Sequence, residues 1–265
     1  MKIFVHCGLI AILTFTLAMA GEFIHDSYPF YVSHSGELIK MISSLIGTLF
    51  AIVLGLLISS SYSTFNNQQS DFNSMAVAVA NMDLILKLYQ DDTRHLRKQL
   101  LASIDRVLKT YWPERSQAGP KDISYDILQE DAEAMINIGS AFHRLEGVSQ
   151  DDVNAMRQYT NQYLATHTNI IRNISNQVPS LLLAIVFGWA CLLFFIYGIL
   201  GSASGFEIFF LFLGSIAIAS ADFLILELTH PYQGLFKVSS ATFDLLYQAI
   251  LVEEGLDGPS AAQSA

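Results

Sequence analysis

The stretch that decides the fold is residues 206–234, F-E-I-F-F-L-F-L-G-S-I-A-I-A-S-A-D-F-L-I-L-E-L-T-H-P-Y-Q-G. The part up to Leu228 is long enough to cross a hydrocarbon core of ~30 Å, which takes about 20 helical residues. Two carboxylates, Asp222 and Glu227, lie inside otherwise apolar sequence, and a proline and a glycine then stop the helix. Ionisable groups at membrane depth are costly, so they indicate a partner, a water-filled cavity or the interface.

Three further stretches carry almost no charge, residues 3–20, 41–61 and 178–200. Only 14% of the 265 residues are charged, whereas soluble domains have about 25%. We therefore expect an all-α membrane protein with four transmembrane helices in two hairpins. The second hairpin closes through a tight turn at residues 201–205.

The basic residues predict the topology. Eleven of the fourteen Lys and Arg lie in residues 87–172, Lys2 precedes the first span and Lys237 follows the fourth. Only Lys40 falls between the first two spans, where an acidic loop over residues 21–37 is expected. Because cytoplasmic loops are enriched in basic residues, both termini and the middle region are predicted on the cytoplasmic side of the cell inner membrane.

The first apolar stretch has two interpretations. Residues 1–20 form a span, or they form a secretory signal, since Ala18-Met19-Ala20 fits a signal cleavage site. Both interpretations place the loop that follows outside the cell.

The organisation predicted from these patterns has four parts: a first transmembrane hairpin with an external loop (1–61), a cytoplasmic helical domain (62–176), a second transmembrane hairpin (177–236), and an amphipathic helix with a disordered tail (237–265). Apolar residues recur at three- and four-residue steps through the middle region, which indicates one-sided helices that pack together as a bundle or on a neighbouring subunit. The C-terminal helix is expected either to dock on that bundle or to lie in the membrane interface.

A stripe of small and hydroxylated residues runs along the second span. Its members fall at steps of three and four and therefore share one helical face: Ser44, Thr48, Ala51, Gly55 and Ser59. Small residues let helices approach closely, so the stripe fits a packing face. It equally fits a pore-facing surface lined by hydroxyls and bounded by apolar constrictions.

The two acids of the fourth span are predicted to belong to different sites, because five residues separate them by roughly 140° around a helix. Asp222 is the deeper of the two, with a structural or an ion- or proton-linked role, and its expected partner is Ser220 or a hydroxyl of another span. Glu227 is nearer the interface and is expected to extend toward it, to act as a cap, or to pair with His230 or Lys237.

Motifs that would fix a reaction are absent from the sequence. No H-E-x-x-H, C-x-x-C, G-x-S-x-G or glycine-rich phosphate loop occurs, and the two cysteines, Cys7 and Cys191, lie in apolar spans. No basic patch of nucleic-acid type occurs in a chain of net charge −10. We therefore predict neither an enzyme nor a cofactor, metal site or nucleic-acid partner.

The C-terminal third resembles a known family. Residues 179–183 (P-S-L-L-L), Trp189 and residues 194–198 (F-F-I-Y-G) are similar to the third-span signature of the bestrophin-like family of prokaryotic membrane proteins. The fourth-span ending, residues 220–228 followed by 231–234 (P-Y-Q-G), resembles that family too. Its motif residues are Pro231, Tyr232 and Gly234, and Tyr232 stands where phenylalanine is typical.

The resemblance implies four spans with a cytoplasmic helical domain between the second and third. By analogy with bestrophins it further implies a homo-oligomeric, possibly pentameric, anion channel with the second span around the axis. The expected partners are therefore the lipid bilayer and further copies of the chain. The alternative is a non-conducting membrane scaffold or sensor whose cytoplasmic helical domain binds a protein partner.

Overall fold

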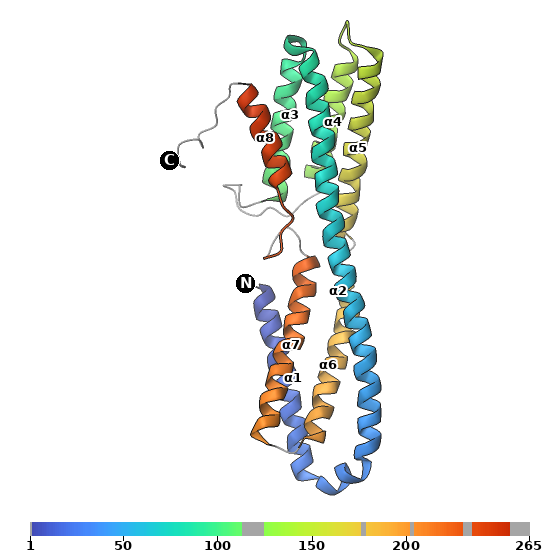
Figure 1. The fold of residues 1–265 in the computed structure, drawn as a ribbon, viewed down its shortest axis with the longest axis vertical. Helices are drawn as coiled ribbons and strands as arrows, with labels where there is room; N and C mark the ends of the chain where they lie inside the picture. The colour runs from blue at the N-terminus through green and yellow to red at the C-terminus, as the bar shows by residue number, and fades with distance from the viewer. Residues whose placement is uncertain (1, 113–124, 176–178, 202–203, 230–234, 255–265) are drawn as a thin grey trace, which may run out of the picture. The chain divides into compact units, whose positions relative to one another are not determined.

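The computed structural model describes residues 2–112, 125–175, 179–201, 204–229 and 235–254 (Figure 1). Within these ranges all regular structure is helical. The helices are α1 (Lys2–Ser27), α2 (Pro29–Leu88), α3 (Gln90–Tyr111), α4 (Tyr125–His143), α5 (Gln150–Ser175), α6 (Ser180–Leu200), α7 (Gly205–Thr229) and α8 (Ala241–Glu253). The chain forms two compact units, unit 1 (residues 1–65 and 177–236) and unit 2 (residues 66–176 and 237–265).

Four helices of the described chain are long and apolar enough to cross a membrane, as the sequence predicted. They are Ile3–Ser27, Gly36–Leu88, Leu181–Leu200 and Gly205–Thr229. Large apolar side chains such as Phe4, Leu181 and Phe206 are exposed along them. Side chains of this kind are stable in contact with lipid rather than water, as a membrane protein requires.

In unit 1, α1 packs closely against α6 and α7. Two glycines permit this approach, because a Cβ at Gly198 would collide with the backbone of Ala18, and one at Gly21 with the backbone of Phe195. Small residues at such a crossing bring two helix backbones into van der Waals contact. Residues 1–20 are therefore an integral part of the packed unit.

A second core in unit 1 joins α2 to α6 and α7. It is built from Phe50 and Leu57 of α2, Val186, Ala190 and Leu193 of α6, and Ile225 of α7. One face of α2 is thus fixed against its own chain.

In unit 2 the predicted apolar stripes form the core. Its largest fully buried side chains include Phe72, Met75, Tyr111, Met135 and Tyr163. α4 packs between α3 and α5, and α8 packs on α3. Phe243 and Ile250 of α8 are buried, so of the two alternatives for the C-terminal helix the structure shows docking on the bundle.

One local prediction is wrong. Residues 21–37 are helical except for Tyr28, rather than a loop, because α1 continues to Ser27 and α2 begins at Pro29, where proline is favoured in a first helical turn. Polar residues continue α1 because they are held there: Glu22 is buried and His25 Nδ1 hydrogen-bonds the carbonyl oxygen of Ile199 at 2.8 Å.

At the start of α5, the Ser149 hydroxyl oxygen caps the helix by accepting a hydrogen bond from the Asp151 N–H at 3.2 Å. The hydroxyl of Tyr89 joins this cap. It accepts a hydrogen bond from the Ser149 N–H at 3.0 Å and donates one to Asp152 Oδ2 at 2.6 Å. The bend between α2 and α3 is thereby fixed to the start of α5.

Candidate functional site

The membrane part of α2 has three different faces. At 100° per residue, the side chains packed on α6 and α7, such as Phe50 and Leu57, occupy one side of the helix. The predicted stripe falls within an arc of roughly 80° on the other side. A row of exposed aliphatic side chains lies beside the stripe: Leu45, Leu49, Ile52 and Leu56.

All five stripe residues are exposed in the isolated chain: Ser44, Thr48, Ala51, Gly55 and Ser59. A Cβ added at Gly55 would meet no atom within 4 Å. The stripe is therefore not used to pack α2 against the described helices of its own chain. The face remains open to a pore, a neighbouring subunit or lipid.

The polar groups of the stripe are uncharged hydroxyls. The Thr48 hydroxyl donates to the Ser44 carbonyl at 2.9 Å, so it is satisfied by its own helix and keeps lone pairs directed outward. Such a surface carries no charge and offers hydroxyl oxygens between apolar steps. Repeated around an axis, it forms polar rings separated by hydrophobic constrictions, as channel pathways do.

Asp222 faces α1, and its partners differ from the prediction. His6 Nε2 lies 3.9 Å from Asp222 Oδ2, and Cys7 Sγ lies at the same distance. Ser220 instead donates to the Ala217 carbonyl at 2.7 Å. The intramembrane acid is thus paired with a histidine and a thiol that lie more than 200 residues earlier in the chain.

A small cavity of about 20 Å³ adjoins Asp222. It is lined mainly by apolar side chains, among them Phe50, Val186, Phe187 and Ile218. A cavity of this size holds at most one water molecule.

Glu227 is 2% exposed, so of the alternatives for this acid the structure does not show extension toward solvent. Its Oε2 accepts hydrogen bonds from the backbone N–H of Leu235 at 2.6 Å and of Phe236 at 3.4 Å. A charged acceptor for backbone N–H groups makes a strong hydrogen bond. Glu227 therefore fastens the chain that follows α7, whereas His230 and the motif residues Pro231, Tyr232 and Gly234 lie outside the described residues.

Comparison with known proteins decides the family. The profile of the Bestrophin-like domain matches residues 10–243. This chain belongs to the bestrophin-like family. The resemblance seen in the third and fourth spans is thereby confirmed, and the protein is a membrane protein of that family.

Solved structures share the fold of this bestrophin-like protein. A tryptophan-to-alanine variant of a bacterial bestrophin homologue from Klebsiella pneumoniae superposes with a TM-score of 0.75 at 16% identity, covering 96% of this chain and 99% of that chain. Another structure of the Klebsiella pneumoniae homologue gives 0.72 at 17% identity, covering 94% and 99%. A variant described only as a membrane protein gives 0.74 at 15% identity, covering 94% and 98%. No curated protein matches this chain.

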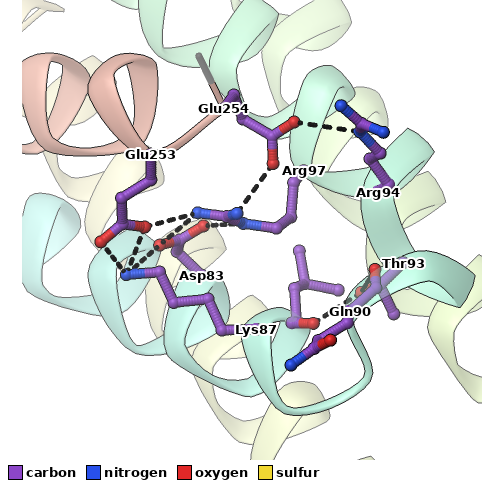
Figure 2. Close-up of polar contacts among 9 residues, drawn as sticks. Asp83, Lys87, Gln90, Thr93, Arg94, Arg97, Glu253 and Glu254 are labelled. Carbon is purple, nitrogen blue, oxygen red and sulfur yellow. Dashed lines mark hydrogen bonds and ion pairs between the residues drawn. The ribbon is translucent and has the colours of Figure 1, made fainter.

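Unit 2 of this bestrophin-like protein contains a charge network that the sequence patterns did not reveal. Figure 2 shows the Arg97 guanidinium between carboxylates of two helices: Nε lies 2.8 Å from Asp83 Oδ1 of α2, and Nη1 lies 2.7 Å from Glu254 Oε1 just after α8. Nη2 also reaches Glu253 Oε2 at 3.0 Å. The network holds the end of α8 on the α2–α3 bend.

The bend itself is strained. Gln90 has a φ of +35°, a conformation that non-glycine residues adopt rarely. Next to it, the buried Thr93 donates to the carbonyls of Leu86 and Gln90 (Figure 2). These contacts hold the turn in place.

Proposed function

We propose that this protein is a homo-oligomeric ion channel, a pentamer by analogy with bestrophins, whose pathway is lined by Ser44, Thr48, Ala51, Gly55 and Ser59. One observation carries the proposal: the stripe is exposed along its length while the opposite face of α2 is buried against α6 and α7. A buried opposite face fixes the rotation of α2, so the stripe points consistently away from its own chain. Membership of the bestrophin-like family adds support.

The arrangement of exposed side chains supports self-association. The aliphatic row of Leu45, Leu49, Ile52 and Leu56 directly borders the stripe. In an oligomer this row packs on the neighbouring copy while the stripe faces the axis. Anion conduction is proposed by analogy with bestrophins, since the stripe offers hydroxyl groups and no carboxylate.

Conduction is tested with the purified oligomer in planar lipid bilayers. Thr48→Trp is expected to abolish most of the current, because an indole on each subunit obstructs a narrow axis. Leu181→Trp is the matched control, since Leu181 is exposed on α6 away from α2's stripe, and it is expected to conduct normally. Absence of current across a broad panel of ions, from verified oligomer, would contradict the proposal.

Orientation is part of the proposal. We place the protein in the inner membrane with both termini and unit 2 on the cytoplasmic side, because thirteen of the fourteen basic residues then lie there. Cytoplasmic and periplasmic reporter fusions at residue 265 distinguish the two orientations. Activity of only the periplasmic reporter would overturn it.

A second function is supported by a different surface, the outer side of unit 2. Val77, Leu84 and Leu88 are exposed along α2, and Leu245 and Val252 along α8. Exposed apolar side chains in a row are typical of protein interfaces. The alternative is accordingly a scaffold or sensor that binds a protein partner; crosslinks from these five positions only to other copies of the chain would count against it.

A further inference from the structure

The core of unit 2 contains a buried carboxyl group that the proposed channel function does not use. Asp131 of α4 is completely buried, with 0% exposure. Neither of its carboxylate oxygens has a hydrogen-bond partner among the described residues. A buried ionised carboxylate without such partners is very costly, so the surroundings favour the neutral acid.

The groups around Asp131 come from each helix packed on α4. They are Arg106 and Tyr111 of α3, Glu130 of α4 itself, and Tyr163 of α5. Tyr163 is also completely buried, and its hydroxyl has no hydrogen-bond partner in the described part of the chain. The His167 ring stacks on Tyr163 with centroids 5.8 Å apart, and its buried Nε2 likewise finds none there.

Among the described residues, Arg106 is the cation that lies close to the acid. Its Nη1 lies 3.6 Å from Asp131 Oδ1, beyond ordinary hydrogen-bond length, and its side chain is 41% exposed. A solvent-screened guanidinium at that distance offsets little of the cost of burial. Burial is the main cause that raises the pKa of Asp131 to about 6, and the positive charge of Arg106 opposes part of this rise.

We propose that Asp131 is a proton-binding site in the core of unit 2, and that the packed bundle is stabilised when this carboxyl group carries its proton. The inference is independent of conduction, because it concerns the folding equilibrium of unit 2 alone. The proton removes the charge that burial makes costly, in a site where neither carboxylate oxygen has a hydrogen-bond partner among the described residues.

The direction of the pH effect follows from the two states. The unfolded carboxyl group has its ordinary pKa of 3.8 and the folded one about 6. The folded unit therefore binds more protons between these values, and its stability falls as pH rises from about 4 to about 6. His167 acts oppositely, since burial lowers its pKa, so the effect of Asp131 is read from the difference between wild type and a neutral variant.

Asp131→Asn keeps the size of the side chain and removes its titration. Amide hydrogen exchange of α4 and α5 peptides, in full-length protein in detergent between pH 4 and 8, reports opening of unit 2. Relative to the variant at the same pH, the opening constant of wild type is expected to rise about 50-fold from pH 4 to pH 7, because the unfolded carboxyl group is already partly ionised at pH 4 and the two pKa values differ by about 2. Glu133→Gln, an exposed acid on the same helix, is the matched control and should leave the wild-type pH dependence unchanged.

Infrared spectroscopy tests the proton directly, even if the variant folds poorly. Wild type should show the carbonyl band of a protonated carboxylic acid at pH 5 that disappears by pH 8. Arg106→Gln should move that transition to higher pH. Three results would each overturn the proposal. The first is a stability difference between wild type and Asp131→Asn that stays constant from pH 4 to 8, and the second is lower stability of the variant at every pH. The third is the absence of the titrating band in wild type.

Discussion

Replacing Arg97 by alanine is expected to destabilise unit 2 by about 3 kcal/mol. The Arg97 side chain is 10% exposed and the variant leaves two buried carboxylates, Asp83 and Glu254, without their main partner. Removing one member of a buried ion pair costs about 3–5 kcal/mol because the other charge remains desolvated. Lys87 Nζ still lies 3.7 Å from Asp83 Oδ2, which places the expected cost at the lower end.

Amide hydrogen exchange of α8 peptides measures this effect, because α8 depends on the network for its docking. A loss of about 3 kcal/mol corresponds to a decrease in protection of roughly 100-fold. Arg94→Ala is the matched control on the same helix. Arg94 is 62% exposed and its Nε lies 3.6 Å from Glu254 Oε2, so that variant should cost at most about 1 kcal/mol.

The double variant Asp83→Ala/Arg97→Ala separates charge burial from lost packing. If the unpaired carboxylate causes the loss, removing Asp83 as well should restore much of the stability. Equal effects of Arg97→Ala and Arg94→Ala would refute the reasoning, and so would a double variant whose cost is the sum of the two single ones.

Four further predictions follow from the described contacts. Gly198→Ala should destabilise unit 1 by about 1–3 kcal/mol because its Cβ collides with Ala18, whereas Gly188→Ala, which meets no atom within 4 Å, should be neutral; melting in detergent compares them. Glu227→Ala should cost about 1–3 kcal/mol because the N–H groups of Leu235 and Phe236 lose their acceptor, and unchanged melting would contradict this. Gln90→Gly should stabilise unit 2 by about 1 kcal/mol by relieving its positive φ, a gain that Gln90→Ala should not give in the same urea titration. Because α1 packs on α6 and α7, mass spectrometry of the purified protein should find peptides from residues 3–20, and their absence would show that the packed form lacks α1.

The helices could be predicted from sequence because the apolar spacing that forms them is local. The steps between Met75, Ala78 and Met82 indicate a one-sided helix wherever its partners lie, and those residues are buried. The four spans were predictable for the same reason, since crossing a membrane requires a length of apolar sequence rather than a particular partner.

The partners of charged groups could not be predicted, because they depend on contacts between distant segments. Asp222 meets His6 and Cys7 only through the packing of α1 on α7. Arg97 meets Glu253 and Glu254 through the docking of α8. Glu227 accepts hydrogen bonds from backbone N–H groups, which every residue except proline carries. A side-chain pattern therefore does not indicate which segment supplies them.

The candidate site was predictable only as a surface. The small-residue stripe was visible at steps of three and four, but its two interpretations, packing and pore, differ in what lies opposite it. The structure excludes the interpretation that the stripe packs against the described helices of the same chain, since Ser44, Thr48 and Gly55 are exposed. What the stripe faces in the membrane is a property of the assembly.

The structure of the purified full-length protein in lipid nanodiscs, viewed along its symmetry axis by electron cryomicroscopy, tests the central claim most directly. We expect a closed homo-oligomer in which α2 is the innermost membrane helix and Ser44, Thr48 and Gly55 face a central opening. A monomer, or an oligomer in which this face of α2 contacts lipid, would contradict the account.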